Sequence, residues 1–185
     1  LRGFSHGCKQ LYSGDRWALT GEAGVFLDPF YSPGSDFIAM SNTYVTELIA
    51  LDRADKPLGP YARLFEQLYR SFYENTMSLF RGQYPIFGDA EVMSMKVIWD
   101  YTYYWAVLCQ LVFQNRLTDT VLLGEMQAEL AEASQLNRDM QAFLLRWYAV
   151  SPRPNARIMF DQRELDWFVE LHARLHDTLD DAGVR

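Results

Sequence analysis

The sequence predicts an α+β chain that is predominantly α-helical, with a short β fragment at its start and about five helices after it. Two runs of strand-favouring residues occupy positions 8–12 and 16–20. Three glycines and two prolines then fall within residues 21–34, which prevents a long regular element there. From residue 35 onward, apolar side chains recur at three- and four-residue steps, the period of an amphipathic helix.

The β fragment is predicted from the turn chemistry between the two runs. Ser13-Gly14-Asp15 separates them, and a Gly-Asp pair between strand-favouring segments is typical of a turn. We therefore expect a β-hairpin or two adjacent strands, followed by a shaped loop over residues 21–34.

The helices are predicted from apolar periodicity and from the breaks between periodic segments. The expected ranges are 35–52, 61–81, 89–115, 117–148 and 164–180. The third is apolar on nearly all faces in its middle, so we expect it to be central and mostly buried. The fourth is long, and we expect a bend near Gly124 or Gln135.

Composition excludes several classes of protein. The chain has 185 residues, of which 49% are hydrophobic, so it can bury a core. Its net charge of −7 repels phosphate backbones and anionic lipids, so we expect neither a nucleic acid nor a membrane as partner. With only Cys8 and Cys109, a disulfide framework is excluded and a cytoplasmic location is expected. No residues show convincing metal-site spacing, so no metal is expected.

The segment most specific to a chemistry runs from residue 17 to residue 36. A carboxylate at Glu22 can accept a hydrogen bond from a sugar or ribityl hydroxyl, and the glycines let backbone approach a planar ring. A helix starting at Ser35 presents N–H groups and a positive dipole end, which stabilise negative charge. Together these features suit a flavin.

This segment resembles the second flavin-binding motif of the p-hydroxybenzoate-hydroxylase-like FAD oxidoreductases. It is more closely similar to that of the flavin-dependent halogenases, including the tryptophan halogenases. The motif reads Gly-Asp-Ala, a few apolar residues, Asp-Pro, two residues and Ser-x-Gly. Here it stands as Gly21-Glu22-Ala23, Asp28-Pro29 and Ser32-Pro33-Gly34. The resemblance implies that residues 1–34 end a FAD-binding domain and that residues 35–185 form a helical C-terminal domain.

The resemblance also implies roles for individual residues. It places Glu22 on the ribityl chain, Pro29 near the reactive face of the isoalloxazine, and the amides of residues 34–36 at its pyrimidine edge. The cofactor-binding set implied is Gly21, Glu22, Pro29, Ser32, Gly34, Ser35 and Asp36. The expected substrate-lining set is Phe30, Tyr31, Trp99, Tyr103 and Trp105, although aromatic side chains on a helix are more often core.

The parent enzyme implied by this resemblance uses FAD and flavin-peroxide chemistry on a small aromatic or enolic substrate, as a halogenase or as a monooxygenase. No Gly-x-Gly-x-x-Gly spacing occurs among the glycines, so the expected partners are a missing N-terminal FAD-binding segment and a flavin reductase. The alternative is a non-catalytic helical interaction domain. Lys96 and Asp100, spaced i,i+4 on the third helix, are expected to form a structural ion pair.

Overall fold

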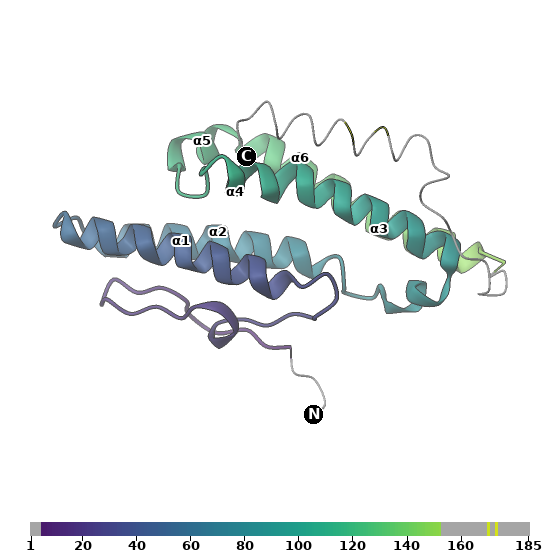
Figure 1. The fold of residues 1–185 in the computed structure, drawn as a ribbon, viewed down its shortest axis with the longest axis horizontal. Coiled ribbons are helices and arrows are strands. Elements are labelled where there is room, and N and C mark those ends of the chain that lie inside the picture. The colour runs from purple at the N-terminus through teal and green to yellow at the C-terminus, as the bar shows by residue number, and fades with distance from the viewer. Residues whose placement is uncertain (1–4, 153–169, 171–172, 174–185) are drawn as a thin grey trace. The chain divides into compact units, whose positions relative to one another are not determined.

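A computed structural model describes residues 5–152, 170 and 173. The chain divides into two compact units (Figure 1). Unit 1 comprises Leu1–Phe80 with Leu117–Thr120, and unit 2 comprises Arg81–Arg116 with Val121–Arg185. The predominantly helical architecture is confirmed, and none of the described helices is long and apolar enough to cross a membrane.

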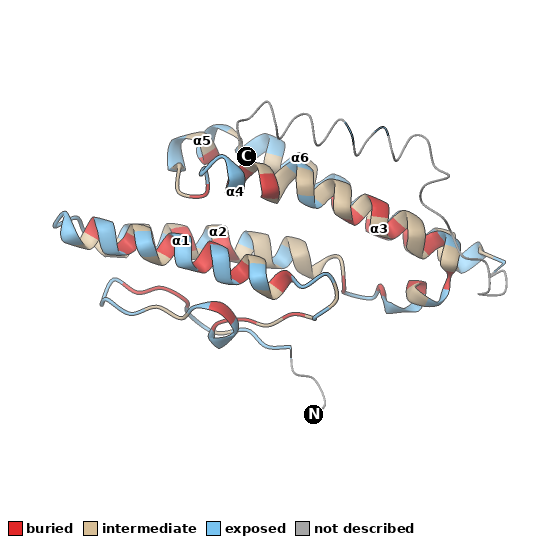
Figure 2. Ribbon diagram, viewed as in Figure 1, coloured by how far each residue is buried: buried red, intermediate tan, exposed pale blue. Residues whose placement is uncertain are grey.

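Unit 1 is built on two long helices that lie side by side, α1 (Pro33–Arg53) and α2 (Leu58–Met77). Figure 2 shows buried and exposed positions alternating along α1, as expected for an amphipathic helix. Aromatic rings fill the space between the two helices. Tyr44 stacks on Phe65 with ring centroids 4.9 Å apart, and Phe37 packs on Tyr69 at 5.4 Å.

The β fragment predicted for residues 8–20 is not formed as regular strands. The described residues contain only isolated antiparallel bridges, His6 to Phe26 and Tyr12 to Ala18. Side chains of α2 take the backbone groups that would have extended a ladder. Glu66 accepts a hydrogen bond from the Leu11 amide at 3.3 Å, and Arg70 donates to the carbonyls of residues 8 and 9. The segment is therefore held on two sides, by α2 and by two backbone hydrogen bonds across the hairpin, from the Ser13 amide to the Trp17 carbonyl at 3.1 Å and from the Leu19 amide to the Leu11 carbonyl at 2.8 Å.

The boundaries of the first two helices differ from the predicted ranges at their ends. The helix predicted over 35–52 begins two residues earlier, because Pro33 is well suited to the first helical position. The helix predicted over 61–81 begins at Leu58 and ends at Met77, and a series of turns leads from there to Gly82, which has a φ of +75°. The predicted domain boundary after residue 34 stays a prediction.

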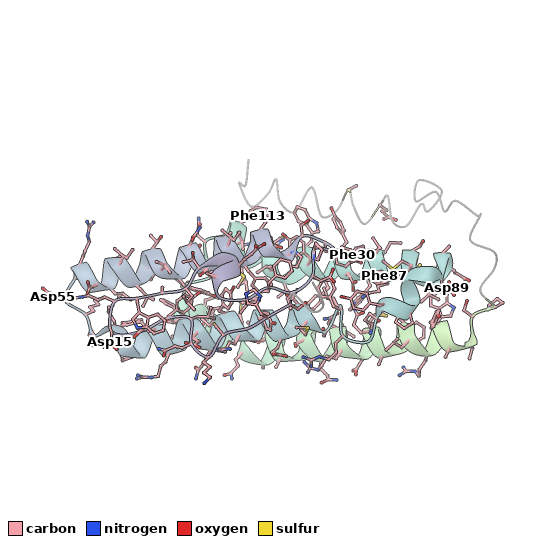
Figure 3. The ribbon with its side chains drawn as sticks, turned by 90° about the horizontal axis from the view of Figure 1, so that it is seen from below. Asp15, Phe30, Asp55, Phe87, Asp89 and Phe113 are labelled. Atoms are coloured by element: carbon pink, nitrogen blue, oxygen red, sulfur yellow. The ribbon has the colours of Figure 1, made fainter. Side chains whose placement is uncertain are left out.

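Unit 2 contains a 3-10 turn (Tyr84–Gly88) and the helices α3 (Ala90–Tyr104), α4 (Gln110–Phe113), α5 (Thr120–Glu125, whose first residue belongs to unit 1) and α6 (Gln127–Val150). Asp89, labelled in Figure 3, begins α3 by accepting hydrogen bonds from the amides of Glu91 and Val92. The helices α3 and α6 pack together around Ile86, Val92 and Leu144.

Two of the predicted helices of unit 2 are interrupted. The helix expected over 89–115 contains a π-helical turn, Trp105–Cys109, between α3 and α4. The helix expected over 117–148 breaks at Met126, two residues after Gly124, where one of the two possible bends was predicted. The helix predicted over 164–180 lies outside the described residues except for Glu170 and Ala173, which are helical and exposed.

Candidate functional site

The residues predicted to contact a cofactor lie around a tight turn that leads into α1. The Asp28 carboxylate accepts a hydrogen bond from the Phe30 amide at 2.8 Å, and the Ser32 amide donates to the Pro29 carbonyl at 2.9 Å. These two bonds reverse the chain within five residues. Phe30, labelled in Figure 3, and Tyr31 follow each other in the turn with ring centroids 4.1 Å apart.

This turn holds two successive non-glycine residues in the left-handed region, Tyr31 with a φ of +67° and Ser32 with a φ of +56°. Each such residue costs about 1–2 kcal/mol relative to a right-handed conformation. The hydrogen bonds of the turn and the contact of Tyr31 with Phe80, whose ring centroids are 6.4 Å apart, hold this conformation. Backbone strain of this kind is concentrated at functional sites.

The turn presents the N-terminus of α1 without a side-chain cap. Ser32 occupies the N-cap position but its hydroxyl accepts no capping hydrogen bond, and Pro33 has no amide hydrogen. Ser35 is exposed and Gly34 is half-buried. A 21-residue helix thus directs the positive end of its dipole toward an open edge of unit 1.

Glu22 lies beside this helix terminus. It belongs to a 3-10 turn, Gly21–Ala23, that packs on α1. Its Oε1 atom is 3.7 Å from the point where a Cβ on Gly34 would stand, so the two predicted cofactor residues are brought together. Gly21 makes this approach possible: its φ is +56°, and a Cβ there would be only 2.9 Å from Cγ1 of Ile38.

The fold therefore gathers the residues of the predicted cofactor set at one edge of unit 1, where Glu22, Pro29, Ser32 and Ser35 are exposed. Such an edge offers a carboxylate as hydrogen-bond acceptor, a glycine that leaves room for a flat ring, and a helix terminus that stabilises negative charge. These groups are chemically compatible with a flavin, and the individual contacts stay a prediction.

The predicted substrate-lining residues divide between the two units. Phe30 and Tyr31 lie in unit 1, whereas Trp99, Tyr103 and Trp105 lie on α3 and its π-helical turn in unit 2. Trp99 stacks on Tyr103 with centroids 6.4 Å apart, and the indole N–H of Trp105 is buried without a hydrogen-bond partner among the described residues. Their joint role as a substrate wall stays a prediction.

Unit 2 also contains a buried polar network that links α3 to α6. The Lys96 ammonium donates to Asp100 Oδ2 and to Gln141 Oε1, both at 2.7 Å, and the Gln141 amide donates to Asp100 Oδ1 at 2.7 Å. Asn137 Oδ1 accepts from Trp99 Nε1 at 3.0 Å and from the Gln141 amide at 3.2 Å. Burial lowers the pKa of Lys96, and the adjacent Asp100 carboxylate opposes that shift.

The ion pair of this network was predicted from its i,i+4 spacing and is confirmed, but its burial and its partners on α6 were not predicted. The side chains of Lys96 and Asp100 are 0% and 2% exposed. A signal was present, because two opposite charges in the middle of a helix expected to be buried must satisfy each other inside the core. Gln141 and Asn137 are more than 35 residues away, a separation at which local spacing carries no information.

Comparison with known proteins identifies a partial relative. The chain is 26% identical over 106 residues to the flavin-dependent halogenase chlA of Dictyostelium discoideum. The match covers 56% of this chain but only 18% of that protein. No protein-family model matches the chain, and no solved structure does. The chain thus has a distant similarity to a flavin-dependent halogenase over about half its length.

Proposed function

We propose that this chain is part of a FAD-dependent oxidoreductase whose flavin is contacted by residues 21–36. The observation that carries the proposal is the strained turn at Tyr31 and Ser32, which presents the uncapped N-terminus of α1 beside Glu22. The partial similarity to a flavin-dependent halogenase supports the same chemistry.

Within this proposal each residue has a physical task. Glu22 accepts a hydrogen bond from a ribityl hydroxyl, and Gly34 leaves space against which the ring can lie. The start of α1, where the Ser35 amide also donates to the Ser32 carbonyl at 3.3 Å, would stabilise negative charge on the pyrimidine edge through the positive end of the helix dipole. A bound flavin would supply two-electron redox chemistry with dioxygen, directed at a small aromatic or enolic substrate.

The partners belong to the same proposal. A separate N-terminal FAD-binding segment would hold the pyrophosphate, and a flavin reductase would supply electrons. Because the pyrophosphate contacts are not among residues 21–36, the chain by itself should bind flavin weakly. We expect the purified chain to be colourless.

The test is a titration of the purified chain with FMN, followed by quenching of flavin fluorescence, in the wild type and in Gly34→Val. A side chain at position 34 meets its nearest neighbour, Glu22 Oε1, at an ordinary contact distance of 3.7 Å, so the variant should fold. It should nevertheless obstruct the ring and raise the Kd at least about tenfold, or roughly 1.4 kcal/mol.

The matched control is Gly124→Val, since a Cβ at Gly124 has no neighbour within 4 Å and the residue lies in unit 2. Far-UV circular dichroism verifies the folding of both variants. Equal FMN affinity in wild type and Gly34→Val, or no saturable binding by the wild type, would contradict the proposed site.

A second candidate function is a non-catalytic helical interaction domain. It is favoured by one observation, a row of exposed apolar side chains on α6 that includes Leu136, Phe143 and Val150. This candidate predicts a partner on that row and no flavin binding. The FMN titration separates the two.

A further inference from the structure

One face of α6 carries a row in which apolar and charged side chains alternate. We define the α6 stripe as Leu136, Asp139, Phe143, Arg146 and Val150, all of which are exposed. At 3.6 residues per turn, these five positions fall within about 80° of one another around the helix axis. The stripe therefore forms a single face that a neighbouring molecule can contact.

The apolar members of the stripe are large and are joined to the core of unit 2. Leu136, Phe143 and Val150 are 54%, 46% and 81% exposed. The ring of Phe143 packs on that of Trp147 with centroids 6.0 Å apart, and Trp147 packs against the core cluster around Leu144. An exposed apolar row that continues a core is typical of a protein–protein contact surface.

The order of side chains along the stripe is complementary to itself when the helix is reversed. Phe143 lies at the centre, Leu136 and Val150 lie seven residues to either side, and Asp139 and Arg146 lie between them. A second copy turned end to end about Phe143 sets Leu136 opposite Val150, and sets Asp139 within one residue, about 1.5 Å along the axis, of Arg146. A two-fold axis forms each of these contacts twice.

The charges favour this orientation over a parallel pair. In a parallel pair, Asp139 would face the same carboxylate of the other copy, and Arg146 would face the same guanidinium, so both contacts would be repulsive. Within one helix the two residues are seven positions apart, beyond the three- and four-residue steps at which helical side chains meet. In the antiparallel pair, each of them instead faces a side chain of opposite charge.

We propose that a second copy of this chain packs antiparallel along the α6 stripe, with the two-fold axis at Phe143. The stripe is about 21 Å long at 1.5 Å per residue. An interface of this length lies at the small end of specific contacts, below about 1,200 Å² in total, so we expect a weak and reversible dimer with a Kd of roughly 10–100 μM. The proposal does not rest on flavin binding, so either can fail without the other.

The first test is analytical ultracentrifugation of the full chain over a series of micromolar concentrations. The wild type should shift from monomer toward dimer as its concentration rises. Arg146→Asp brings two carboxylates together at each end of the pair, and should raise the Kd at least about tenfold. The double variant Asp139→Arg, Arg146→Asp reverses both charges and should restore the wild-type Kd.

The matched control is Arg138→Asp, which makes the same change of charge at an exposed position off the stripe and should leave the Kd nearly unchanged. A second measurement is disulfide cross-linking of Phe143→Cys in a Cys8→Ser, Cys109→Ala background. Because position 143 lies on the proposed axis, this variant should form covalent dimers. Ala142→Cys, exposed but off the stripe, should form them only at the background rate.

Three results would overturn the proposal. A chain that stays monomeric at every concentration, and whose Phe143→Cys variant cross-links no faster than Ala142→Cys, has no such dimer. A dimer that Arg146→Asp leaves intact is formed by another surface. A double variant that dimerises as weakly as Arg146→Asp alone refutes the antiparallel register.

Discussion

Replacing Lys96 by methionine should destabilise the protein strongly, because Lys96 is the cation of a buried ion pair. Its ammonium lies 2.7 Å from Asp100 Oδ2 and 2.7 Å from Gln141 Oε1, and its side chain is fully buried. Removing one partner of a buried pair leaves a carboxylate in the core without its counter-charge, which costs about 3–5 kcal/mol. Total stabilities are about 5–15 kcal/mol, so this loss is large.

The second step of the experiment is the double variant Lys96→Met, Asp100→Leu. Removing both charges eliminates the uncompensated carboxylate, so the double variant should lose less stability than the sum of the two single variants. Full recovery is not expected, because the amide of Gln141 donates to Asp100 and accepts from Lys96, and each lost hydrogen bond inside the core costs about 1–3 kcal/mol.

The matched control is the exposed ion pair between Arg16 and Asp52, which spans 3.1 Å with side chains 75% and 33% exposed. Arg16→Met should cost less than about 1 kcal/mol, because solvent screens such pairs. Urea unfolding followed by circular dichroism gives the free energies. For a chain of this size, the loss in Lys96→Met corresponds to a Tm lower by roughly 6–20 °C. Equal small effects of Lys96→Met and Arg16→Met would refute the buried network.

The pH dependence of the same variants gives an independent reading. Burial lowers the pKa of Lys96 in the folded chain below its ordinary value of 10.5, which applies to the unfolded chain. Between the folded-state pKa and the unfolded-state pKa, the unfolded chain therefore binds more protons than the folded chain. The contribution of Lys96 to the free energy of unfolding therefore rises with pH across that window. The stability difference between wild type and Lys96→Met should increase there, and a difference independent of pH would contradict the shift.

Two further pairs of substitutions test unit 1. Gly21→Ala should destabilise the protein by more than about 1 kcal/mol in urea unfolding, since the residue has a φ of +56° and its new Cβ would stand 2.9 Å from Ile38. Gly7→Ala should be nearly neutral in the same measurement, because no atom lies within 4 Å of a Cβ there. Tyr44→Phe should leave stability unchanged or raise it, because the buried Tyr44 hydroxyl has no hydrogen-bond partner among the described residues. Tyr12→Phe loses a hydrogen bond to Ser41 and should cost about 1 kcal/mol of stability. Equal losses of stability in the two variants, measured by calorimetry, would contradict this difference.

The sequence alone predicted the elements whose cause is local. The period of apolar residues identified α1 and α2 to within a few residues, because helix pairing requires one apolar face and that face recurs every three to four positions. The i,i+4 spacing likewise identified the Lys96–Asp100 pair. The order of carboxylate, Asp-Pro and Ser-x-Gly indicated the turn before α1, since proline fixes φ and glycine disfavours a long regular element, both independently of the rest of the fold.

The tertiary structure alone decided whatever depends on residues distant in sequence. Residues 8–12 have strand-favouring side chains, yet Glu66 and Arg70 of α2 bind backbone groups of residues 8, 9 and 11, and only an isolated bridge joins Tyr12 to Ala18. The burial of Lys96 depends on Gln141 of α6, which no local pattern links to it. Propensity describes what a segment can form, whereas hydrogen bonds and burial are shared among segments, so their distribution is determined only when the segments pack together.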